Sequence, residues 1–196
     1  MTHMSWSLRG RRLWGVGLVA AALAVAPVTT AAGASTASAG IADGTWSCSR
    51  PPAGYTYDAL QQSFGCDALY PVIMYHIRVP KDGLQACSVP QGWTHSNYSF
   101  GWNSCGLNGG SASRYTLRIP RDGLSACSVP QGWAYDHLSS EWGICTNNTS
   151  GLVYHLRAPV AGLWSCNVPS GWAYSGTSTV LAECTVSGCG RKYRLA

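Results

Sequence analysis

Residues 122–159, DGLSACSVPQGWAYDHLSSEWGICTNNTSGLVYHLRAP, decide the fold because the chain states this pattern four times. Each copy has a cysteine near its start and a second cysteine 18 positions later. The four pairs are Cys48 and Cys66, Cys87 and Cys105, Cys127 and Cys145, and Cys166 and Cys184. A repeat period of about 40 residues is typical of arrays, solenoids and propellers.

Two phrases of the repeat predict strands. The phrase Gly-Leu-x-[Ala/Ser]-Cys-x-Val-Pro alternates and ends at a proline, which favours a short strand that cannot continue inside a sheet. The phrase Tyr-x-[Ile/Leu]-Arg-x-Pro places apolar and polar residues on opposite faces, and it is the clearest strand of each unit. It occupies residues 75–80, 115–120 and 154–159, with a truncated copy at 193–195.

Between these phrases, Gly-[Trp/Tyr]-x-[Tyr/His] leads through roughly ten mostly polar residues to the second cysteine. Residues 57–64 could form two helical turns, but residues 96–99 and 175–178 are poor helix formers. We therefore predict a loop or a frayed helical turn here, and a third strand near the second cysteine. The expected fold is mainly β, with two or three short strands and room for a short helical turn in each repeat. Because no linker separates the units, they should pack as one continuous or closed array.

Residues 1–39 have the pattern of an export signal. Basic residues at positions 9, 11 and 12 precede the apolar run 13–28, and Ala37-Ser38-Ala39 fits a small-residue cleavage site. An uncleaved membrane anchor is the alternative, but the run is shorter than a bilayer span. We expect a secreted or cell-surface protein, with no stable membrane insertion after signal removal. The repeats then occupy residues 40–81, 82–121, 122–160 and 161–196.

An oxidising compartment favours structural disulfides at this cysteine density. The simplest pairing joins the two cysteines of each unit: Cys48–Cys66, Cys87–Cys105, Cys127–Cys145 and Cys166–Cys184. Closing a loop of this length stabilises the fold by about 3 kcal/mol. The ninth cysteine, Cys189, has no counterpart in the other units and is expected to stay unpaired. No Cys-x-x-Cys or His-x-x-x-His pattern indicates zinc, so no metal is expected.

Charge and motifs exclude several function classes. Three of the 13 basic residues lie in the export signal and all eight acidic residues follow it, so the remaining chain has a net charge of only +2. Nucleic-acid binding needs clustered basic residues, which are missing, and no nucleic acid is expected as a partner. The sequence has no Gly-x-Ser-x-Gly, His-Glu-x-x-His or phosphate-loop motif, so we assign no catalytic residue and no cofactor.

Aromatic residues are the main candidates for binding. Those present in every unit, such as Trp133 and Tyr154, are expected to pack in the fold. Trp102 and Trp142 are also expected to pack, because they align with Leu181. Aromatic residues that the common fold does not require are better binding candidates, as are the arginines that recur on the Tyr-x-[Ile/Leu]-Arg strand. This set is Trp46, Tyr98, Trp164, Arg78, Arg118 and Arg157.

These patterns favour a secreted, non-catalytic repeat protein that binds a polysaccharide or cell-wall glycan multivalently. The alternative is an extracellular protein as partner, with the chain acting as a protease inhibitor or as a structural coat component. An enzyme is less favoured, because the sequence offers no asymmetric catalytic constellation. The alanine-rich leader and the Trp-, Gly- and Cys-rich remainder resemble those of exported bacterial proteins.

Overall fold

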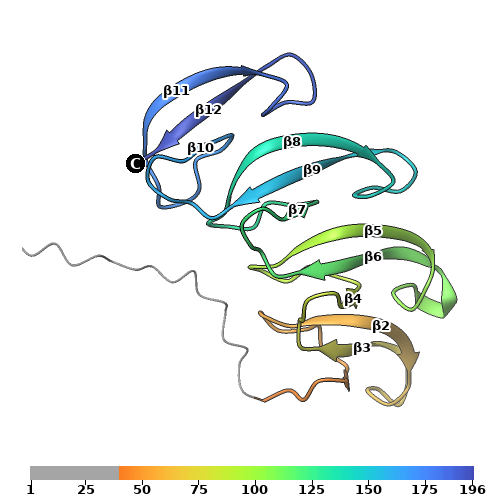
Figure 1. Cartoon of the computed structure of the whole chain (residues 1–196). Helices are drawn as coiled ribbons and strands as arrows, with labels where there is room; N and C mark the ends of the chain where they lie inside the picture. Colours follow the sequence, from red (N-terminus) through yellow and green to blue (C-terminus); the bar gives the residue numbers. More distant parts are fainter. Residues whose placement is uncertain (1–39) are drawn as a thin grey trace, which may run out of the picture. The chain divides into compact units, whose positions relative to one another are not determined.

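Twelve strands in four antiparallel sheets form the part of the chain that the computed structural model describes, residues 40–196 (Figure 1). The predicted export signal lies outside these residues. The strands are β1 (Thr45–Ser47), β2 (Thr56–Ser63), β3 (Val72–Arg78), β4 (Gln85–Ala86), β5 (Thr94–Trp102), β6 (Ser111–Arg118), β7 (Ser125–Ala126), β8 (Ala134–Trp142), β9 (Ser150–Arg157), β10 (Trp164–Ser165), β11 (Tyr174–Leu181) and β12 (Cys189–Leu195).

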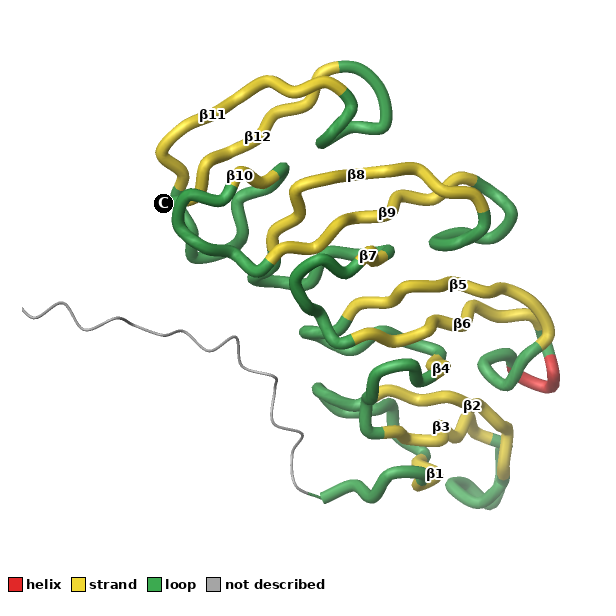
Figure 2. Tube along the Cα trace, in the orientation of Figure 1, coloured by secondary structure: helices red, strands yellow, loops and turns green. Residues whose placement is uncertain are grey.

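All four sheets have the same topology. The Tyr-x-[Ile/Leu]-Arg strand lies in the centre, between a short strand at the first cysteine and a long strand that pairs with it as a hairpin (Figure 2). The strand orders are β1-β3-β2, β4-β6-β5, β7-β9-β8 and β10-β12-β11. The mainly β fold and both predicted strands of the repeat are confirmed.

The prediction of a loop or frayed helical turn before the second cysteine is wrong. This segment is the long strand of each sheet, as in β5, which pairs with β6 from Thr94 to Trp102. Weak local helix propensity is overridden by the ladder of cross-strand hydrogen bonds. A register shift interrupts each long strand near its start, between His95 and Asn97 in β5. The only helix in residues 40–196 is the 3₁₀ turn η1 (Leu107–Gly109).

The core is built from one equivalent aliphatic side chain per repeat. Ile77, Leu117, Leu156 and Leu195 are all at most 1% exposed. Each lies on the central strand two residues after the repeated tyrosine, as period-two alternation requires. In the third sheet, Leu156 packs with Leu124 and Ala126, and Trp133, Tyr135 and Tyr154 lie against this cluster. The repeated aromatic residues are therefore part of the fold, as predicted.

A glycine turn before the long strand is conserved in geometry through all four repeats. Gly54, Gly92, Gly132 and Gly171 have φ between 81° and 86°. This left-handed region is open to glycine without steric cost, and a β-carbon would be strained there. The invariant glycine of the Gly-[Trp/Tyr] phrase therefore sets the direction in which the long strand leaves the turn.

Consecutive sheets are joined by backbone hydrogen bonds, so the repeats form one continuous array. The first cysteine of each later repeat donates its N–H to the long strand before it: Cys87 to Tyr57, Cys127 to His95 and Cys166 to Tyr135, at 2.7–2.8 Å. The long strand in turn donates to the residue before the second cysteine of the next repeat: Leu60 to Ser104, Tyr98 to Ile144 and Leu138 to Glu183.

Candidate functional site

Four disulfides hold the repeats, and the predicted pairing is confirmed. They join Cys48 to Cys66, Cys87 to Cys105, Cys127 to Cys145 and Cys166 to Cys184, with Cα–Cα distances of 5.2–5.9 Å. Cys189, at the start of β12, is exposed and carries a free thiol. Four disulfides indicate an oxidising environment. Within residues 40–196, no helix is long and apolar enough to cross a membrane, and no group of three His, Cys, Asp or Glu side chains could hold a metal ion.

The most exposed aromatic side chains lie where the long strands end. Trp102 is 82% exposed and Trp142 is 70% exposed. Seven residues after the Tyr or His of the Gly-[Trp/Tyr] phrase, the first repeat has Phe64 and the fourth has Leu181, 62% and 72% exposed. We call these four the strand-end residues. The prediction that Trp102 and Trp142 pack is wrong: the hairpin extends beyond the part of the sheet that is covered by core, so its last residue projects into solvent.

Further exposed apolar side chains lie within six residues of the strand-end residues in the sequence. Leu69 and Tyr70 are exposed in the loop after Cys66, Phe100 is exposed on β5, and Ile144 and Val186 are exposed near the second cysteines of the last two repeats. The hydrogen bond from each of the first three long strands to the residue before the next repeat's second cysteine keeps consecutive hairpin tips on the same side (Figure 2). The tips therefore present a recurring apolar and aromatic surface.

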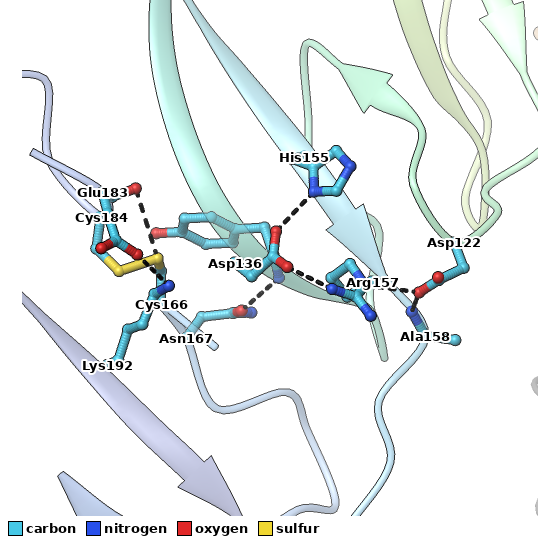
Figure 3. A network of polar contacts seen from close by, with 11 residues as sticks. Asp122, Asp136, His155, Arg157, Ala158, Cys166, Asn167, Glu183, Cys184 and Lys192 are labelled. Atoms are coloured by element: carbon cyan, nitrogen blue, oxygen red, sulfur yellow. Dashed lines mark hydrogen bonds and ion pairs between the residues drawn. A yellow bond between two sulfur atoms is a disulfide. The ribbon is translucent and has the colours of Figure 1, made fainter. Parts of the chain in front are cut away.

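A polar network links the central strand β9 of the third sheet to the long strand β8 and to the opening Asp-Gly turn (Figure 3). The Asp136 carboxylate accepts hydrogen bonds from Arg157 and from His155 Nδ1, which lies 2.6 Å from Asp136 Oδ1. Arg157 Nε also donates to Asp122 Oδ1 at 2.9 Å, and the same oxygen accepts the backbone N–H of Ala158 at 3.0 Å. The network ties the Asp-Gly turn that opens the repeat to the end of its central strand.

Hydrogen bonds in the network shift the pKa values of Asp122, Asp136 and Arg157. Burial raises the pKa of Asp136, but hydrogen bonds from His155 and Arg157 outweigh it and hold the pKa below its ordinary value. The hydrogen bond from Arg157 lowers the pKa of Asp122, and that with Asp122 raises the pKa of Arg157. Opposite charges within hydrogen-bond reach favour the charged form of both partners. The Arg157 charge is thus shared between two carboxylates.

The first repeat has the same network, and the second has a reduced one. Asp58 accepts from His76 Nδ1 at 2.5 Å and from Arg78, whose Nε donates to Asp43 at 2.8 Å. In the second repeat Arg118 Nε lies 3.5 Å from Asp82. Ser96 and Thr116 replace the aspartate and histidine there, and Gln85 donates to Thr116 at 2.6 Å. No sequence motif indicates these networks, because their partners lie 18–36 residues apart and meet only through strand pairing.

The predicted binding residues are divided between different sheets and faces. Trp46, 37% exposed, stacks on His76 with ring centroids 4.9 Å apart, and it shares this face of the first sheet with Arg78. Trp164, 39% exposed, pairs across the fourth sheet with Arg194. Arg118 and Arg157 lie in the two sheets between.

Tyr98 lies on the opposite face of its sheet from Arg118. Its ring contacts Tyr115 edge-on at 5.6 Å, and its hydroxyl is 3.0 Å from Ser113 Oγ. Its alternation along β5 places Tyr98 on the same face as Phe100 and Trp102. Tyr98 thus lies at the base of the exposed aromatic row of the second hairpin.

A cleft of about 450 Å³ opens between the first repeat and the loop after β4 of the second. It was not predicted, although a one-residue insertion before Gly54, relative to the other repeats, marks the place. Burial raises the pKa of Tyr57, one of its three tyrosines. The cleft is lined by Arg50, Pro51, Tyr55, Tyr57, Tyr75, Ser88, Val89 and Pro90.

Comparison with protein-family models, with curated proteins and with solved structures gave no match. Function is therefore inferred from the geometry of the repeats, above all from the strand-end residues.

Proposed function

We propose that this chain is an exported, non-catalytic repeat protein that binds a polysaccharide or cell-wall surface through its hairpin tips. The observation that carries the proposal is the exposure of Trp102 and Trp142 at equivalent positions of adjacent repeats. Tryptophans that are 82% and 70% exposed at two equivalent positions are not explained by packing of the fold. A flat indole ring stacks on the apolar face of a sugar ring, while its N–H bonds to hydroxyls.

Multivalency gives such weak contacts a useful total affinity. Each hairpin tip offers only one strand-end residue, and single stacking contacts bind weakly. Tips held in one array engage a repeating polymer together, so each further contact is intramolecular and raises the overall affinity without a new kind of site. The four disulfides and the recurring core keep the tips at fixed separations, which limits the entropy lost on binding.

Export is supported by the disulfides and by the pattern of residues 1–39. An oxidising compartment is where four disulfides persist. Mass spectrometry of the protein recovered from culture medium or periplasm tests this directly. We expect an N-terminus at or near Gly40, whereas a chain retained in the cytoplasm with residues 1–39 intact would contradict export.

A pull-down with insoluble polysaccharides and purified cell walls tests the proposed ligand class. We expect the wild-type chain to be depleted from solution by at least one of them. The double variant Trp102→Ala/Trp142→Ala should lose this binding. The matched control is Trp46→Ala/Trp164→Ala, which removes two tryptophans from the other face and should bind as the wild type does. Equal binding by the wild type and the strand-end double variant would contradict the proposal.

A protein partner is the second candidate, and the first repeat favours it. Leu69 and Tyr70, in the loop that follows Phe64 and Cys66, are 78% and 69% exposed, so this tip exposes apolar side chains beyond its strand-end residue. Exposed apolar clusters of this kind mark protein–protein contacts. Loss of an extracellular protein partner on Leu69→Ser/Tyr70→Ser, with polysaccharide binding absent in the wild type, would favour this candidate.

A further inference from the structure

The contact between consecutive repeats is built in the same way three times. The long strand of one repeat receives the Cys-[Ser/Asn]-Val-Pro segment of the next. In the first contact, Tyr57 O accepts the N–H of Cys87 at 2.7 Å, and Leu60 N donates to Ser104 O at 2.8 Å. Both groups belong to the long strand at its register shift. The later two contacts repeat these bonds within 0.1 Å.

A buried side-chain pair completes each contact and varies in a matched way. Thr56 Oγ1 donates to Ser88 O at 2.7 Å, and Thr94 Oγ1 does the same to Ser128 O. In the third contact alanine replaces the threonine and Asn167 replaces the serine. Asn167 then accepts from Tyr135 N and donates to Trp133 O, both at 3.1 Å. The contact is thus a defined interface with its own complementary chemistry.

The fourth repeat presents the receiving half of this interface uncovered. Its long strand β11 is the edge of its sheet and has the same register shift, between Tyr174 and Gly176. Thr177 pairs with Tyr193 as Leu60 pairs with Tyr75, so the Thr177 N–H points away from β12. Tyr174 is 55% exposed, whereas the equivalent Tyr57 and Tyr135 are half-buried beneath the next repeat.

The first repeat presents the donating half uncovered. Cys48, Ser49 and Pro52 are exposed. Their equivalents in the later repeats are half-buried or buried, and Pro90, Pro130 and Pro169 are all buried. The two ends of residues 40–196 therefore expose the two halves of the interface that the chain forms three times, with one inserted residue and Arg50 in place of valine in the first-repeat segment.

We propose that the edge strand β11 binds the Cys48–Pro52 segment of a second copy of this chain, giving head-to-tail assembly. We choose a second copy as the partner because it carries the same kind of segment that covers the long strand in the three internal contacts. A second copy supplies a cysteine N–H for Tyr174 O, a carbonyl for Thr177 N–H and prolines for the exposed Tyr174 ring. Such a contact is heterologous, because each copy uses a different surface, and it leaves both ends of the assembly free to add further copies.

The contact between copies is weaker than the internal ones. Thr177 takes the place of Leu60, Tyr98 and Leu138, so less apolar surface is buried. Ala173 would face Ser49, a combination with neither the Thr–Ser hydroxyl contact nor the asparagine bridge. Two copies also lose the translational freedom that repeats of one chain have already lost. Assembly is therefore reversible and depends on protein concentration.

Sedimentation velocity of the purified full chain over a 100-fold concentration range tests the proposal. We expect the weight-average mass to rise from one copy toward several. Thr177→Pro removes the outward N–H and should keep the chain at one copy, because proline is tolerated on an edge strand but blocks further pairing. Thr179→Pro is the matched control two residues along β11, and it should assemble like the wild type.

A constant monomer mass over this range would overturn the proposal, and so would assembly that Thr177→Pro leaves unchanged. Disulfide trapping adds a test that depends on the register. In the first internal contact, Thr56 Oγ1 and Ser88 Oγ are 2.9 Å apart; Ala173 and Ser49 are their equivalents between copies. In a Cys189→Ser background, mixing the Ala173→Cys and Ser49→Cys variants should give a covalent dimer. Neither variant alone should give one, and dimers formed equally by each variant alone would contradict this register.

Discussion

At the residue scale, the Asp136 carboxylate is the centre of the hydrogen bonds that join the turn and the strands of the third repeat. It accepts hydrogen bonds from His155 and Arg157, and Arg157 carries the link onward to Asp122 in the opening turn. Hydrogen bonds to charged groups contribute more than neutral ones, and a half-buried charge left without its partner is costly. The network therefore stabilises the junction of turn and strand, and Asp58 has the same role in the first repeat.

Replacing Asp136 should destabilise the chain more than replacing an exposed aspartate. Asp136→Asn removes the charge that faces Arg157, and we expect the free energy of unfolding to fall by about 1–3 kcal/mol. Asp67→Asn is the control, since Asp67 is exposed and only accepts the N–H of Leu69 in its own loop. Urea unfolding followed by tryptophan fluorescence measures both. Equal effects of the two substitutions would show that the network contributes no stability.

Acid should weaken the fold through the same carboxylates. Hydrogen bonds from Arg78 and Arg157 lower the pKa values of Asp43 and Asp122 below the ordinary 3.8, and the pKa of Asp136 is also lowered. The unfolded chain therefore binds more protons in acid, so this stability is present above about pH 4 and is lost as the pH falls toward the folded pKa values.

Urea midpoints at pH 6 and pH 3 check this dependence. We expect the wild type to have the lower midpoint at pH 3, and Asp136→Asn to lose less stability than the wild type between the two pH values. A wild-type midpoint that is unchanged at pH 3 would contradict the assigned pKa directions.

At the scale of the element, each disulfide joins the short strand of a sheet to the loop at its hairpin tip. The Cys127–Cys145 bond closes a loop of 18 residues around β8. Cross-linking of this kind stabilises mainly by restricting the unfolded chain. It also fixes the tip residue whose carbonyl accepts the bond from the preceding long strand, so it supports the contact between repeats.

Removing one disulfide should cost more than removing the free thiol. We expect Cys127→Ala/Cys145→Ala to lower the free energy of unfolding by about 3 kcal/mol. Cys189→Ser should leave it unchanged within about 0.5 kcal/mol, because Cys189 is exposed and unpaired. Thermal unfolding under non-reducing conditions compares the two variants. A large loss from Cys189→Ser would mean that this thiol takes part in the fold.

At the third contact between repeats, Ala134 faces Asn167, whereas at the second contact Thr94 faces Ser128. We therefore expect that a second substitution can restore the stability lost in a first one. Ala134 is fully buried beside Asn167, so Ala134→Thr should overpack the site and destabilise the chain by about 1–3 kcal/mol. Adding Asn167→Ser recreates the Thr94–Ser128 arrangement of the second contact and should restore most of the loss. A double-mutant cycle in urea measures the coupling. Additive effects would contradict the proposed matching.

Short sequence patterns predicted those elements whose conformation depends on residues near in the sequence. Period-two alternation found the central strands, and equal cysteine spacing found the disulfides. The third strand was predicted near the second cysteine, but the first half of β5 was not, because residues such as Ser96 and Asn97 have no strand pattern of their own and pairing with β6 decides their conformation. The Asp136 network was missed for the same reason, since its members meet only after register is set.

At the scale of the whole molecule, four equivalent tips carry the surface that we assign to binding. Comparing repeats identified which aromatic residues belong to the core, but it assigned Trp102 and Trp142 wrongly. Alignment with Leu181 suggested packing, although Leu181 is itself 72% exposed. Equivalence between repeats shows that positions share an environment, and only the folded hairpin shows whether that environment is core or solvent.

The central claim is that the tips bind multivalently. Its most direct test measures how strongly single and double strand-end variants bind a polysaccharide that the wild type binds. Affinity electrophoresis compares the wild type with Trp102→Ala, Trp142→Ala and the double variant. We expect roughly tenfold weaker binding for each single variant, about 1.4 kcal/mol, and at least 100-fold weaker binding for the double variant. Binding by the double variant equal to that of the wild type would contradict the claim.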